Sequence, residues 1–163
     1  MMSQFTQTLA EAKAAVVAGR DDGIACPCCD QFCKVYKRKL NANMVRGLLW
    51  LYKTAGETSD WLYVPGQQPS WLAKSRELPK CRHWRLAEQR DNDDTAKKDS
   101  GYWRVTSDGC DFAERRMRVP SHCHLYDNEI VGWSDTKVTI EEALGEKFSY
   151  AELMGRSTLF PNG

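Results

Sequence analysis

Hydrophobic residues recur at intervals of three and four near the start of the chain and again after residue 40. In the first segment this spacing predicts an amphipathic helix from Ser3, its N-cap, to Gly19. Its apolar stripe is expected to cover the core or to pair with a second copy of the chain. The second segment gives the clearest helix, which Asn41 or Asn43 caps and Gly56 ends.

Short apolar runs alternate with polar breaks between residues 61 and 106. The elements predicted there are a strand at 61–64, short helices at 67–74 and 79–86, a polar hairpin tip at 90–101 and a strand at 102–106. Pro79 opens the second of these helices, where its missing N–H does no harm. The polar stretch is predicted to be a hairpin tip because a strand pattern resumes directly after it.

The last third of the chain repeats the alternation of helix and strand. We expect a helix at 108–118, a hairpin at 122–133 with its turn at 126–129, a helix opened by Thr139 and ended by Gly145, and a helical turn at 150–154. No internal repeat and no low-complexity segment is found in the sequence.

The order helix, strand, helix, helix, hairpin between Asn41 and Thr106 is that of a winged helix. The predicted fold class is therefore α+β, with a winged helix-turn-helix core, an N-terminal helix, a short cysteine knuckle and a C-terminal hairpin plus helix. We assign the N-terminal helix and knuckle to residues 1–39 and the winged-helix domain to residues 40–163. A chain of 163 residues suits one compact unit of this kind.

Charge is balanced in total but unevenly distributed along the chain. The net charge is +1, from 23 basic and 22 acidic residues. Basic residues gather at 34–46 and 74–85, whereas acidic residues gather at 88–99 and 141–152. Because the third helix of a winged helix can enter the major groove, the second basic cluster predicts binding to duplex DNA.

The residues expected to contact DNA belong to both basic clusters. They are Lys37, Arg38, Lys39, Lys74, Arg76, Lys80, Arg82, His83 and Arg85. The basic side chains are expected to meet phosphates; Arg82 and Arg85 are alternatively placed to reach guanine edges, and His83 to meet a phosphate or a base. The alternative interpretation is a solvated face that pairs with the acidic segments. The acidic residues of the predicted wing would repel phosphate, and a wing of this kind is equally suited to a basic protein surface.

Seven cysteines suggest metal binding or reactivity more than a disulfide scaffold. Cys26 and Cys29 form a C-x-x-C pair, which is half of a tetrahedral zinc site. We expect two of four further residues to complete the Zn²⁺ site. These candidates are Cys33, His122, Cys123 and His124. His122 and His124 fall on one face of a strand and Cys123 on the other. The alternative is that the remaining cysteines are small buried side chains and the knuckle holds no metal.

The sequence contains no motif of a known class of active site. It has no H-E-x-x-H, no phosphate-binding glycine loop and no G-x-S-x-G. Cysteine and histidine residues are present, but no spacing favours one catalytic pair. We therefore expect a non-enzymatic protein. The first residues show no secretory signal and no apolar stretch is long enough to span a bilayer, so the expected location is the cytoplasm.

Two stretches carry a resemblance to known proteins. Leu78-Pro-Lys-Cys-Arg-His-Trp-Arg-Leu-Ala-Glu and Gly101-Tyr-Trp-Arg-Val-Thr-Ser-Asp-Gly109 resemble the last helix, wing and following helix of winged-helix regulators. With Cys-Pro-Cys-Cys-Asp-Gln31 and Glu-Ala-Leu-Gly-Glu-Lys-Phe-Ser-Tyr near the end, residues 24–154 are similar to small bacteriophage proteins with a Cys-Pro-x-Cys knuckle and a winged-helix domain. Arg85 stands where such proteins tend to carry Gly, and Cys81 where they carry an apolar residue.

The resemblance and the charge pattern together lead to two expectations for function. The first is a winged-helix DNA-binding protein, a phage-encoded regulator in the bacterial cytoplasm. The alternative is a non-enzymatic protein-interaction module that binds or inhibits a host protein. Either one is compatible with a homodimer, because DNA-reading winged helices often use two-fold symmetry.

Overall fold

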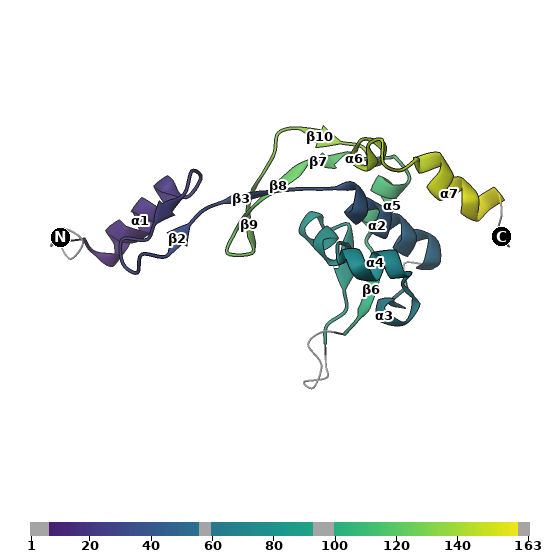
Figure 1. Cartoon of the computed structure of the whole chain (residues 1–163), viewed down its shortest axis with the longest axis horizontal. Helices are drawn as coiled ribbons and strands as arrows, with labels where there is room; N and C mark the ends of the chain where they lie inside the picture. The colour runs from purple at the N-terminus through teal and green to yellow at the C-terminus, as the bar shows by residue number, and fades with distance from the viewer. Residues whose placement is uncertain (1–6, 56–59, 93–99, 160–163) are drawn as a thin grey trace. The chain divides into compact units, whose positions relative to one another are not determined.

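The computed structural model describes residues 7–55, 60–92 and 100–159 (Figure 1). The chain is a mixture of helices and antiparallel sheets, which confirms the predicted α+β class. It divides into two compact units. We call residues 1–38 with 122–133 the knuckle unit, and residues 39–121 with 134–163 the core unit. The hairpin at 122–133 belongs with the N-terminal residues.

The knuckle unit opens with helix α1, Leu9–Gly19. A capping box fixes its start: the Thr8 hydroxyl accepts the N–H of Glu11 at 3.1 Å, and the Glu11 carboxylate accepts the N–H of Thr8 at 3.2 Å. Ser3, the predicted cap, lies outside the described residues. The stripe does not cover the core, because Ala12 is the only buried residue of α1 and Leu9 is 63% exposed; its pairing with a second copy stays a prediction. Since alanine and valine residues lie on all sides of this helix, their spacing does not identify one inward face.

Two small sheets complete the knuckle unit. Strands β1, Ile24–Ala25, and β2, Phe32–Cys33, form an antiparallel hairpin in which Ile24 pairs with Cys33. Strands β3, Tyr36–Lys39, β8, His122–Tyr126, and β9, Glu129–Trp133, form a sheet in the order β3-β8-β9. Asp127 and Asn128 both have positive φ, as a two-residue hairpin turn requires, so the predicted hairpin and its turn are confirmed.

The core unit is built around helix α2, Ala42–Ala55. Its cap is Asn41, whose side-chain oxygen accepts the N–H of Met44 at 2.9 Å. The buried residues of α2 are Met44, Val45, Gly47, Leu48, Leu49, Leu51 and Tyr52. Because these residues cover more than one side of the helix, α2 is surrounded by other elements and forms the centre of the core. Gly56, its predicted end, lies outside the described residues.

Short elements follow α2 in the order predicted, with different boundaries. They are β4, Leu62–Tyr63, α3, Val64–Gln67, α4, Ser70–Ser75, the 3₁₀ helix η3, Leu78–Trp84, β5, Ala87–Gln89, and β6, Tyr102–Val105. The three strands form an antiparallel sheet in the order β4-β6-β5. The predicted hairpin tip at 90–101 is described only in part, since residues 93–99 lie outside the described residues.

Two boundaries of these elements were predicted wrongly for local reasons. Val64 begins a helical turn and does not end the strand, because Pro65 suits the first turn of a helix. The third helix is a 3₁₀ helix that stops before Arg85, because this residue has a left-handed conformation, with φ 57°; Arg76, with φ 53°, ends the preceding helix in the same way. Neither conformation can be read from arginine in a sequence, since this residue rarely adopts it.

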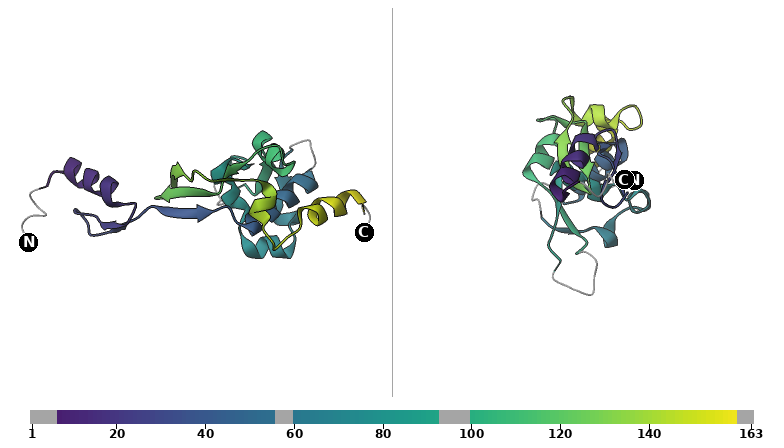
Figure 2. Two further views of the ribbon diagram at one scale, coloured as in Figure 1. Left: turned by 90° about the horizontal axis from the view of Figure 1, so that it is seen from above. Right: turned by 90° about the vertical axis from the view of Figure 1, so that its left-hand side faces the viewer.

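The chain after β6 encloses the remaining sides of α2. The elements are α5, Ser107–Ala113, β7, Val119–Pro120, β10, Lys137–Val138, α6, Ile140–Leu144, and α7, Tyr150–Leu159. β7 and β10 pair antiparallel. The predicted helix at 108–118 ends early because Arg115 has a left-handed conformation, with φ 65°. Thr139 and Glu142 form the capping box of α6, which ends before Gly145 as predicted. Figure 2 gives two further views of these elements.

Candidate functional site

The basic cluster of the core unit lies on and beside η3, which three buried side chains hold in place. Leu78, Cys81 and Trp84 face the interior, and the indole N–H of Trp84 donates to the carbonyl of Pro120 at 2.7 Å. The Cys81 thiol donates to the carbonyl of Met44 at 3.3 Å, and burial raises the pKa of this thiol to about 12. With this side buried, η3 exposes Arg82 on its other side.

The turn after η3 is clamped from the following helix. The carbonyl of Arg85 accepts the hydroxyl of Thr106 at 2.5 Å, and the carbonyl of Leu86 accepts the N–H of Thr106 at 3.1 Å. The Thr106 hydroxyl also caps α5 by accepting the N–H of Gly109 at 2.9 Å. Thr106 therefore couples the start of α5 to the backbone that carries Arg85.

The predicted DNA-contacting residues of this cluster differ in their surroundings. Lys74, Arg76, Arg82 and Arg85 are exposed, and within residues 7–55, 60–92 and 100–159 no carboxylate forms an ion pair with any of them. Lys80 instead lies 3.0 Å from Glu77, a carboxylate that is only 17% exposed. Charge is thus available at the arginines and partly neutralised at Lys80.

His83 and a surface groove lie beside the exposed arginines of the cluster. His83 is half-buried, and its ring meets that of Trp84 edge-on with centroids 6.5 Å apart. A surface groove of about 670 Å³ is lined by Arg82, Arg85, Ala87, Glu88, Gln89, Thr106, Ser107 and Asp108. Glu88 is paired across the sheet with Arg104, at 2.5 Å, so its charge is already compensated.

The other predicted phosphate contacts lie on β3. Lys37 and Lys39 are exposed, and Arg38 is half-buried with its Nε atom buried and unpaired. Lys37 and Arg38 belong to the knuckle unit, whereas Lys39 and residues 74–85 belong to the core unit. The predicted set is therefore divided between the two units.

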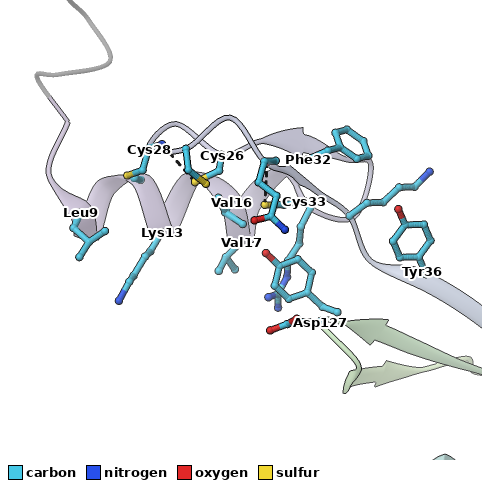
Figure 3. A pocket seen from close by; sticks show the side chains of 16 residues that line it. Leu9, Lys13, Val16, Val17, Cys26, Cys28, Phe32, Cys33, Tyr36 and Asp127 are labelled. Atoms are coloured by element: carbon cyan, nitrogen blue, oxygen red, sulfur yellow. Dashed lines mark hydrogen bonds between the residues drawn. The ribbon is translucent and has the colours of Figure 1, made fainter.

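The cysteine cluster occupies the tip of the β1–β2 hairpin. The Cys26 sulfur accepts the N–H of Cys28 at 3.4 Å and also the N–H of Cys29. These backbone donors, with the Cys29 and Cys28 thiols, hold the pKa of Cys26 below its ordinary value, because they stabilise the thiolate. The cysteines line an apolar groove of about 740 Å³ together with α1 (Figure 3).

The proposed completing ligands are not gathered around Cys26 and Cys29. Cys33 donates its thiol to the carbonyl of Gln31 at 3.5 Å and contacts the hydroxyl of Tyr126. On β8 the alternating burial places His122 and His124 on one face and the fully buried Cys123 on the other, as expected. Within the described part of the chain no three histidine, cysteine or acidic side chains are arranged to hold a metal ion.

Sequence reasoning missed two features near the candidate surface. Thr106 binds the carbonyls of Arg85 and Leu86, and Gly109 leaves room for the Leu86 carbonyl. Arg46, counted in the first basic cluster, has its guanidinium 3.7 Å from the centre of the Trp71 ring and 4.7 Å from that of Phe148. It therefore has a structural role, as an aromatic-packed cation.

No family model, curated protein or solved structure matches this chain. No described helix has both the length and the apolar character needed to cross a membrane.

Proposed function

We propose that the core unit binds duplex DNA as a winged helix, with Arg76, Arg82 and Arg85 as its main contacts. The observation that carries this proposal is the exposure of these three arginines at η3, without a carboxylate partner among the described residues. Exposed guanidinium groups that lack ion pairs suit phosphate, because each contact releases counterions from the duplex.

The order of elements supports the same proposal. The order α2, β4, α4, η3, β5, β6 is the one expected of a winged helix, with the short helix α3 as an additional turn after β4. The strands β5 and β6 pair with each other, and β6 also pairs with β4. In such an arrangement η3 occupies the place of the reading helix.

The dimensions of η3 limit what it can read. Its seven residues rise about 2 Å each, so it is roughly 14 Å long, close to the width of about 12 Å of the major groove. Arg82 lies near its end and Arg85 directly follows it, while Arg76 precedes it. We therefore assign base contacts to Arg82 or Arg85 and a phosphate contact to Arg76.

Lys80 contributes less than the sequence predicts. Its amine is bound to Glu77, which also accepts the side-chain N–H of Asn41 at 3.3 Å. Moving Lys80 onto a phosphate would leave this partly buried carboxylate without its cation, which opposes binding. Lys80 accordingly anchors η3 to the cap of α2.

A charge-reversal experiment tests the proposal. Arg82→Glu with Arg85→Glu is compared with Lys137→Glu with Lys147→Glu, which changes net charge equally. Lys137 and Lys147 are exposed, and neither lines the groove that Arg82 and Arg85 share. Fluorescence anisotropy with a labelled random-sequence duplex at low salt measures binding.

The first variant is expected to weaken binding about tenfold or more, which is about 1.4 kcal/mol, and the second by much less. Circular dichroism checks that both variants are folded. Equal losses of DNA affinity in the two variants would show that binding depends on net charge and not on Arg82 and Arg85. A wild-type chain that does not bind the duplex at low salt contradicts the proposal and leaves the arginines to an acidic protein partner.

A further inference from the structure

Cys26 and Cys29 lie at C-x-x-C spacing in the turn between β1 and β2. The Cys26 sulfur accepts the backbone N–H of Cys28 at 3.4 Å, a bond within this turn. Two sulfurs at C-x-x-C spacing in a hairpin turn are the usual half of a tetrahedral zinc site. Both cysteines are accessible, since Cys29 is exposed and Cys26 is half-buried.

A structural zinc ion takes four protein ligands, and the described residues of one chain do not supply them. Cys33 is held away by its bonds to the Gln31 carbonyl and the Tyr126 hydroxyl. The two missing ligands must therefore come from another chain or from a rearranged one. The surface around the cysteines distinguishes between these two sources.

The helix and hairpin of the knuckle unit bury very little apolar surface by themselves. Among residues 7–35 only Ala12 and Val35 are buried. Small elements with so small a core usually depend on a metal, a disulfide or association. The large apolar side chains around the cysteines are exposed: Leu9 is 63%, Val17 58%, Phe32 60% and Tyr36 60% exposed.

These side chains line the same groove as the cysteines. Leu9, Val17, Phe32 and Tyr36 line this groove together with Cys26, Cys28 and Cys29. Figure 3 shows Cys26 and Cys28 beside α1. A partner that supplies two thiolates also has to cover this apolar surface. A second copy of the chain does both, because it presents the same thiolates and the same apolar side chains.

We propose that two copies of this chain share one Zn²⁺ ion, held by Cys26 and Cys29 of each copy, and pack their α1 and hairpin surfaces against each other. Each of the four thiols gives up its proton to water on binding, and the metal is neither oxidised nor reduced. The proposal is independent of DNA binding, since it involves residues of the knuckle unit only.

Zinc titration of the full chain tests the shared site. Protein treated with a chelator and kept reduced receives ZnCl₂ while native mass spectrometry follows mass and metal content. We expect monomer to convert to a dimer that carries one zinc ion per two chains, and chelator to reverse this. A monomer with one zinc ion, or a chain that stays metal-free, overturns the proposal.

Serine substitutions within the same turn identify the ligands. Cys26→Ser and Cys29→Ser are expected to abolish both zinc uptake and dimer formation, whereas the matched control Cys28→Ser keeps both. Tryptophan fluorescence of the core unit verifies that each variant is folded. The absorption of bound Co²⁺ gives a second readout, because tetrahedral thiolate coordination has a characteristic spectrum. Equal loss in the Cys28→Ser variant overturns the assignment.

Discussion

Gly109→Ala tests whether α5 packs as closely on the η3–β5 turn as the structure indicates. A Cβ atom at this position would lie 2.0 Å from the carbonyl oxygen of Leu86 and 2.6 Å from a methyl group of Val105. The nearest atom belongs to the backbone, so it cannot rotate away. The same carbonyl accepts the N–H of Thr106, which restrains it further.

Two opposing contributions set the size of the effect. Alanine is favoured over glycine inside a helix by about 1 kcal/mol. Against this, overpacking a buried site typically costs about 1–3 kcal/mol, and a clash with a backbone oxygen belongs at the upper end of that range. We expect a net loss of about 2 kcal/mol, which lowers the melting temperature by roughly 4–8 °C for a chain of this size.

Thermal unfolding followed by circular dichroism measures this loss. Gly66→Ala is the matched control, because its Cβ would meet only the ring of Tyr63, at 3.1 Å. The control is expected to melt within a degree or two of the wild type. If Gly109→Ala melts at or above the wild-type temperature, α5 does not lie against the Leu86 carbonyl and the described clamp on Arg85 is wrong.

Three further predictions concern the packing of η3. The pKa of the Cys81 thiol is about 12 in the folded chain and near 9 in the unfolded chain. The free energy of unfolding therefore falls as pH rises from 9 towards 12, by about 1.4 kcal/mol per pH unit. Cys81→Ala is expected to remove this part of the decline, which urea unfolding curves across that pH range measure. Trp84→Phe leaves the Pro120 carbonyl without its donor and is expected to cost about 1–3 kcal/mol in the same assay, whereas a smaller loss would show that water replaces the indole. Thr106→Ala removes both the cap of α5 and the bond to Arg85 and is expected to lower the free energy of unfolding by about 1–2 kcal/mol. Thr106→Ser is expected to restore most of this stability. If serine does not restore it, the loss comes from the methyl group of Thr106.

Elements with local signals were predictable from the sequence. Asn41 caps α2 by its own side chain, Asp127 and Asn128 tolerate the positive φ of their turn, and Thr139 forms its box with Glu142. Each signal lies within a few residues of the element that it defines, so no knowledge of tertiary packing is needed.

Features that depend on distant contacts were not predictable. The left-handed conformation of Arg85, which ends η3, is accompanied by a bond to its carbonyl from Thr106, 21 residues away. The pairing of Lys80 with Glu77 is local, but its partial burial comes from the packing of the core unit. The grouping of the hairpin at 122–133 with the N-terminal residues arises from the pairing of β3 with β8.

The same distinction holds for the candidate sites. Cys26 and Cys29 are neighbours in sequence, so their convergence on one turn follows from C-x-x-C spacing. The remaining ligands lie far along the chain, and spacing alone does not decide which of them approach. The separation of Cys33 from this pair was accordingly found only in the structure.

The salt dependence of DNA binding tests the central claim most directly. For each phosphate that a cation neutralises, the slope of log affinity against log salt concentration changes by about 0.9. Arg82→Gln with Arg85→Gln is expected to make this slope shallower by about 0.9, because one of the two arginines is assigned to a base and the other meets a phosphate. A slope equal to that of the wild type would contradict the assignment of these arginines to the DNA surface.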